Sequence, residues 1–131
     1  MKNLTKPKKR NKRKTLENKL DKLVRLVVLK RAGYKCEKCG RYMEKGLNVH
    51  HVFTRYNRAV RWLPENLVAL CPNHHCQGKD SAHLRPAEFI EWFKETKGQE
   101  VYDYILRESG KVKKWTLKEM EEYVEELEGM L

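Results

Sequence analysis

Apolar residues in the first third of the chain predict a helix over residues 15–31. From Leu16 to Val27 they recur every three or four positions, which places them on one helix face. Gly33 can adopt the left-handed conformation that closes a helix end. Residues 1–14, in contrast, lack apolar periodicity and carry eight basic and no acidic side chains, so we expect a disordered basic arm there.

The rest of the chain contains two short strand signals followed by three helix signals. Residues 48–53 and 67–70 are short apolar runs typical of strands. Pro86 is suited to the first position of a helix that ends at Gly98, and a second helix is expected over residues 100–108. The run Thr116-Leu-Lys-Glu119 is a capping-box signature for a last, acidic helix. The pattern predicts an α+β fold in which helices flank a small sheet.

Composition and net charge indicate which class of partner such a fold would bind. The chain has 131 residues, the size of one domain, and a formal net charge of +11. Eight of the 29 bases lie in residues 1–14, so the remaining 21 bases face 18 acids and leave +3. A basic arm favours a polyanion, most often nucleic acid. The longest aliphatic run is Leu26–Leu29, and no secretory signal follows the N-terminus, so we expect a cytoplasmic protein without a membrane span.

Four cysteines and five histidines lie between positions 36 and 83. Cys36 and Cys39 have the two-residue gap that lets two thiolates bind one tetrahedral ion, and Cys71 and His74 repeat that gap. Without export the thiols stay reduced, which favours metal binding over disulfides. We therefore predict a structural Zn²⁺ site of Cys36, Cys39, Cys71 and His74, with Cys76 as an alternative fourth ligand.

The remaining histidines indicate a second metal. His50 and His51 are adjacent on an expected strand, where neighbouring side chains point to opposite faces, so one can bind an ion while the other faces a substrate. His75 and His83 follow the zinc ligands. A lone histidine is usually a plain core or surface residue, but five among zinc ligands favour a second ion.

Two longer stretches carry a family resemblance. His50-His51-Val52 and Pro64-Glu-Asn66-Leu-Val-Ala-Leu-Cys71-Pro-Asn-His74-His75 resemble the HNH endonucleases, the ββα-metal nucleases, in their zinc-knuckle form. Arg58-Ala-Val-Arg61-Trp62 and Ser81-Ala-His83 look like small phage-encoded members. The resemblance covers about residues 33–93. It implies a ββα-metal core with a zinc knuckle in a nuclease domain at 15–97, followed by a C-terminal helical extension at 98–131.

The resemblance also implies roles for individual residues. His50, His75 and His83 would bind the catalytic divalent ion, and His51 would be the general base that activates water. Asn66 would hold the loop and the orientation of His51. His51, Asn66 and His75 are thus the expected catalytic residues. The chain departs from the family pattern in the long gap between His75 and His83 and in having His74 where a cysteine is usual.

The expected activity is metal-dependent hydrolysis of DNA phosphodiester bonds. Availability suggests Mg²⁺ or Mn²⁺ as the catalytic ion, whereas imidazole ligands also suit Ni²⁺, Co²⁺ or Zn²⁺. The expected phosphate contacts come from two groups of bases: Arg55, Arg58, Arg61, Lys8, Lys9 and Arg10. For the three arginines, a solvated loop is the competing interpretation. The alternatives to a nuclease are a non-catalytic zinc-knuckle DNA-binding module or an accessory protein of phage packaging or recombination machinery.

Two further expectations concern packing. Trp62 is expected to be a core anchor. The acidic helix at the C-terminal end could pack on the domain, pair with the basic helix at 15–31 or face a protein partner, and we expect an intrachain role. The oligomeric state stays open.

Overall fold

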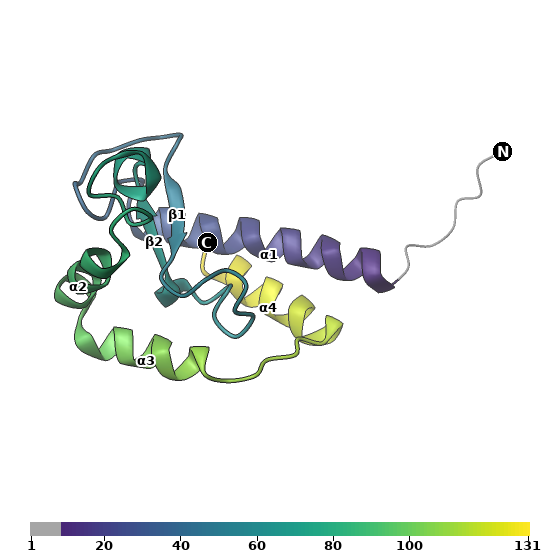
Figure 1. The fold of residues 1–131 in the computed structure, drawn as a ribbon. Coiled ribbons are helices and arrows are strands. Elements are labelled where there is room, and N and C mark those ends of the chain that lie inside the picture. The colour runs from purple at the N-terminus through teal and green to yellow at the C-terminus, as the bar shows by residue number, and fades with distance from the viewer. Residues whose placement is uncertain (1–8) are drawn as a thin grey trace.

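The computed structural model describes residues 9–131 and has the expected α+β composition. Its helices and strands are α1 Lys9–Arg31, β1 Asn48–His51, β2 Leu67–Leu70, α2 Pro86–Lys97, α3 Gln99–Ser109 and α4 Leu117–Gly129. Short helical turns cover Pro64–Asn66 and Asn73–Gln77. Figure 1 shows the strands near the C-terminal end of α1, with α2 and α3 below them and α4 beside α1. Within residues 9–131, no helix has the length and apolar character needed to cross a membrane.

Helix α1 begins at Lys9, six residues before the predicted start at residue 15. Residues 9–14 are therefore helical where a disordered arm was expected, and residues 1–8 lie outside the described part. The reason is a contact that the local sequence does not reveal. Lys12 pairs with Glu121 at 3.2 Å, and the Arg13 guanidinium lies 3.5 Å from the Met120 sulfur, so α4 supplies acidic and apolar partners for the basic turn.

The sheet is a single antiparallel pair. In its register Asn48 lies opposite Leu70, and His51 lies opposite Leu67. Strand β2 is buried at all four positions and β1 is half-buried, so β2 is the inner strand. Strand β1 ends at His51 rather than at the predicted Phe53, because the Phe53 N–H donates to the side-chain oxygen of Asn66 at 2.8 Å.

Trp62 is a core anchor, as predicted, with 1% of its surface exposed. Its indole N–H donates to Asp21 of α1 at 2.7 Å, and its carbonyl accepts from the Tyr123 hydroxyl of α4 at 2.6 Å. The ring meets Trp115 edge to face, with centroids 5.4 Å apart. Trp62 thus fastens the loop between the two strands to both long helices.

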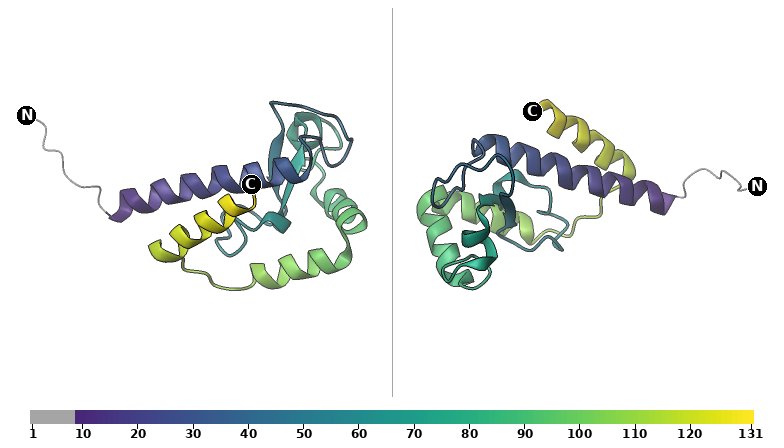
Figure 2. Two further views of the ribbon diagram at one scale, coloured as in Figure 1. Left: turned by 180° about the vertical axis from the view of Figure 1, so that it is seen from behind. Right: turned by 90° about the horizontal axis from the view of Figure 1, so that it is seen from above.

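The C-terminal helices follow the predicted signals closely. Pro86 opens α2, and Gly98, whose φ of 104° suits glycine, separates α2 from α3. Thr116 and Glu119 form the predicted capping box of α4. The two views of Figure 2 show α4 running alongside α1. Ion pairs join the two helices near both ends of α4. Lys12 pairs with Glu121 at 3.2 Å, and Lys19 lies 3.8 Å from Glu128. The acidic helix therefore has the intrachain role that was expected, since it pairs with the basic helix and also packs on the loop at Trp62.

Candidate metal centres and active site

The first cluster brings together the four predicted zinc ligands, Cys36, Cys39, Cys71 and His74. Their ligand atoms all lie within 4.8 Å of one another. The Cys39 and Cys71 sulfurs are 3.9 Å apart, and His74 Nδ1 lies 3.7 Å and 3.2 Å from the sulfurs of Cys36 and Cys71. A tetrahedral Zn²⁺ with ordinary bond lengths separates two sulfurs by about 3.8 Å and a sulfur from a nitrogen by about 3.6 Å. The cluster is therefore compatible with a structural zinc site.

Local backbone geometry produces this cluster. The Gly40 N–H donates to the Cys36 carbonyl at 2.8 Å, and Gly40 has a φ of 78°, so the chain turns tightly enough to aim two thiols at one point. In the other half, the His74 N–H donates to the Cys71 carbonyl at 3.0 Å. Cys76, the alternative ligand, is exposed and is not among the four clustered residues.

The cluster also favours a thiolate at Cys36. Burial raises the pKa of this thiol, but backbone N–H groups of Cys71, Cys39 and Lys38 outweigh burial and lower the pKa to about 6. A thiolate is the form that binds a metal ion. Cys36 is therefore prepared to bind an ion near neutral pH.

The second cluster consists of His50, His75 and His83, the three predicted ligands of the catalytic ion. One ring nitrogen of each lies within 4.8 Å of the others. His75 Nε2 and His83 Nε2 are 2.9 Å apart. Two imidazoles that bind one ion at right angles place their nitrogens about 3.0 Å apart. His75 Nδ1, the other nitrogen of this ring, is buried and has no hydrogen-bond partner within the described residues.

Burial favours the neutral form of two rings in this second cluster, His50 and His75. Burial lowers the pKa of His50 to about 3, and the neighbouring rings of His75, His83 and His51 act in the same direction. Burial and His83 also lower the pKa of His75. Neutral imidazoles carry the lone pairs that a metal ion needs. His50 and His75 can therefore each offer a nitrogen lone pair to an ion without first losing a proton.

His51 lies outside this cluster but lines the same cavity, whose volume is about 620 Å³. Its Nε2 lies 3.1 Å from the Arg61 carbonyl oxygen. A carbonyl only accepts, so the ring proton belongs on Nε2, and Nδ1 keeps an unprotonated lone pair. Burial lowers the pKa of His51, and the charges of Arg55 and Arg61 add to this effect, although the Arg61 carbonyl and Asp21 oppose it. Neutral His51 can therefore accept a proton.

The cavity itself favours an anion. It is lined by four histidines and one arginine: His50, His51, His75, His83 and Arg55. The remaining lining residues have apolar or hydroxyl-bearing side chains. Within residues 9–131, no carboxylate side chain is part of this lining. A phosphate group would meet imidazoles and a guanidinium there, with no acidic side chain to repel it.

Asn66 holds the loop, as the resemblance implied, but it does so without contacting His51 directly. Its side chain is fully buried, accepts from the Phe53 N–H and donates to the carbonyls of Phe53 and Val60 at 3.0 and 3.1 Å. The direct partner of His51 is the Arg61 carbonyl. The sequence could not reveal this partner, because every residue has a backbone carbonyl.

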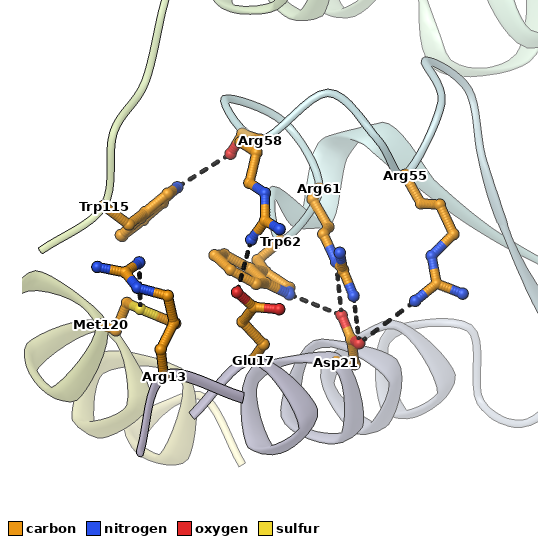
Figure 3. A network of polar contacts seen from close by, with 9 residues as sticks. All are labelled: Arg13, Glu17, Asp21, Arg55, Arg58, Arg61, Trp62, Trp115 and Met120. Carbon is orange, nitrogen blue, oxygen red and sulfur yellow. Dashed lines mark hydrogen bonds and ion pairs between the residues drawn. The ribbon is translucent and has the colours of Figure 1, made fainter. Parts of the chain in front are cut away.

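The three arginines expected to contact phosphate have different surroundings (Figure 3). Arg61 has a side chain that is only 8% exposed and donates twice to Asp21, at 3.0 and 2.7 Å, so the phosphate contact proposed for it is replaced by a structural ion pair. Arg58 is half-exposed and pairs with Glu17 at 2.8 Å. Arg55 is more than half exposed, lies 3.6 Å from Asp21 and lines the cavity, so it is the one of the three that can turn to a substrate.

The remaining predicted DNA contacts cannot be placed. Lys8 lies outside the described residues, and only the backbone of Lys9 and Arg10 is described, as the first residues of α1.

The two clusters meet at adjacent residues, since His74 belongs to the first and His75 to the second. Comparison of the chain with models of known families, with curated proteins and with solved structures gives no match.

Proposed function

We propose that this protein is a metal-dependent DNA endonuclease that hydrolyses phosphodiester bonds at an HNH-type ββα-metal site. The observation that carries the proposal is the meeting of His50, His75 and His83 around one point, with His51 in the same cavity. Three nitrogen donors leave positions for a phosphate oxygen and a water, as a catalytic metal site requires.

The two clusters have different roles in this proposal. Cys36, Cys39, Cys71 and His74 form a complete four-ligand set without an open position, which is typical of structural zinc. This zinc would fix the turn that carries both His74 and His75. The histidine cluster is the open, catalytic one. Its all-imidazole donor set favours Mn²⁺, Co²⁺, Ni²⁺ or Zn²⁺ over Mg²⁺, which prefers oxygen ligands.

His51 would act as the general base. Its Nδ1 takes the proton of the attacking water, while the Arg61 carbonyl holds the Nε2 proton and stabilises the imidazolium that results. When bound at the histidine cluster, a divalent ion supplies the positive charge that stabilises the scissile phosphate. Arg55 would contact a second phosphate oxygen from the cavity wall.

DNA is the proposed substrate because the charges favour a phosphate polymer. The formal net charge is +11, and the described cavity is lined by one arginine and no carboxylate. The net positive charge would attract such a polyanion, and its binding would weaken with salt.

Cleavage of supercoiled plasmid by the full, zinc-loaded chain tests this proposal. The reaction is run with Mn²⁺, Mg²⁺, Co²⁺, Ni²⁺ or EDTA. Removal of a general base costs about 10²–10⁴ in rate, so we expect His51→Ala to lose at least about 100-fold in cleavage. Its zinc content, melting temperature and DNA affinity should match the wild type. Val112→Ala, at a site that is 91% exposed, is the control variant.

The outcomes separate the alternatives. Cleavage that persists in EDTA, or equal cleavage by His51→Ala, would contradict the proposed chemistry. DNA binding without cleavage in any metal would favour a non-catalytic DNA-binding module instead.

A further inference from the structure

We propose that Asp21, on helix α1 and outside the strands and turns that carry the histidines, is a positioning residue for the general base His51. The inference rests on the proposed function and deepens it. It starts from the peptide between Arg61 and Trp62, because the Arg61 carbonyl is the hydrogen-bond partner of the His51 ring. The position of that one oxygen sets which way His51 Nδ1 faces.

The Asp21 carboxylate accepts hydrogen bonds from the side chains on both sides of this peptide. One carboxylate oxygen accepts from Arg61 Nε at 3.0 Å and from the Trp62 indole N–H at 2.7 Å, and the other accepts from an Arg61 terminal nitrogen at 2.7 Å. Arg61 and Trp62 are 7% and 1% exposed. Charge-assisted hydrogen bonds of this length are the stronger kind, and here they immobilise two buried side chains that flank the carbonyl. The Arg61 carbonyl therefore has little freedom to turn away from His51.

A second carboxylate on α1 provides a natural comparison. Glu17, one helical turn earlier, pairs with Arg58 at 2.8 Å and is itself 7% exposed. The Arg58 carbonyl, however, accepts from the Trp115 indole at 3.0 Å and has no histidine partner within the described residues. Figure 3 shows the two pairs side by side between α1 and the loop. Both fasten the loop to α1, but only the Asp21 pair leads to His51.

Asp21 also restrains Arg55, whose guanidinium lies 3.6 Å from the same carboxylate. Loss of the Asp21 charge releases Arg55 toward the cavity while it loosens the peptide that holds His51. Substrate binding should therefore be unchanged or stronger when the charge is removed, and the chemical step should be slower. A purely structural ion pair would not separate KM from kcat in this way.

The test compares Asp21→Asn with Glu17→Gln in the full, zinc-loaded chain. Zinc content and melting temperature establish that each variant is folded. Small misplacements of a catalytic group cost up to about 100-fold in rate, so we expect kcat for Asp21→Asn to fall about 10- to 100-fold without a rise in KM. Glu17→Gln should change kcat by less than about threefold. Arg61→Lys, which retains the charge but not the paired geometry, should fall between them.

A spectroscopic measurement tests the positioning role without any cleavage. In the ¹⁵N imidazole spectrum of the neutral ring, wild-type His51 should show one protonated and one unprotonated nitrogen, the pattern of a fixed Nε2–H tautomer. Asp21→Asn should average the two signals, and Glu17→Gln should preserve them.

Equal kcat losses in Asp21→Asn and Glu17→Gln, or an unchanged His51 spectrum in Asp21→Asn, would overturn the inference. A wild-type protein that does not cleave DNA would refute the proposed function, and the spectrum would then decide the positioning role alone.

Discussion

Replacement of Asn66 by alanine is a direct test of how the loop around the candidate site is held. Asn66 is fully buried and forms three hydrogen bonds with the backbone of Phe53 and Val60. Alanine removes all three partners at once. An unsatisfied buried polar group costs about 1–3 kcal/mol. Phe53 is half-buried, so water can hydrogen-bond to some of the backbone groups that lose Asn66. We therefore expect a total loss of about 3–6 kcal/mol in the free energy of unfolding.

Urea denaturation of the zinc-loaded protein measures this loss. For a domain of this size, 1 kcal/mol corresponds to about 3–5 °C in melting temperature, so the melting temperature should fall by more than about 10 °C. Asn57→Ala is the matched control, because the Asn57 amide lies in the same loop, is half-buried and forms only two hydrogen bonds, to Ser109 and Ala59. Its loss should be about 1–2 kcal/mol. Equal losses in the two variants would refute the assignment of Asn66 as the main support of the loop.

Two further measurements address the cysteine cluster and the Tyr123 hydroxyl of α4. Cys71→Ser should lose bound zinc and unfold at a lower temperature, because structural zinc contributes directly to folding. Cys76→Ser should retain the bound zinc and the wild-type melting temperature. Loss of zinc from both variants alike would argue against this ligand set. Burial, with the charges of Glu126 and Glu65, raises the pKa of Tyr123, so the stability that this hydroxyl contributes is present below pH about 10 and is lost as the pH rises further. The wild type should therefore lose up to about 1.4 kcal/mol per pH unit relative to Tyr123→Phe above that pH, and parallel pH profiles for the two proteins would contradict this account.

Local signals in the sequence predicted the elements that local interactions determine. Strand 67–70, the helix from Pro86 to Gly98 and the Thr116 cap all depend on neighbouring residues, and the structure contains each of them. The Cys-x-x-Cys and Cys-x-x-His spacings likewise predicted which four side chains converge, because each pair is fixed by one tight turn.

Contacts between distant segments could not be predicted in the same way. The helical state of residues 9–14 depends on α4, more than 100 residues later, and the ion pairs of Arg58 and Arg61 depend on the polar face of α1. A basic loop next to clustered histidines is typical of phosphate binding, and nothing in the local sequence distinguishes Arg55, which lines the cavity, from the buried Arg61. The choice between His74 and Cys76 needed the turn geometry as well.

The packing of α4 on α1 has a consequence for synthesis on the ribosome. Arg13 and Met120 are 107 residues apart, yet they are in contact, so the side of α1 that packs on α4 stays uncovered until that later segment has been translated. At a translation rate of about 5–20 residues per second, this delay is about 5–20 seconds. Helix α1 also carries Asp21, which holds the peptide behind His51. A nascent chain that already contains the cysteine and histidine clusters would thus keep part of this helix uncovered until α4 has been translated.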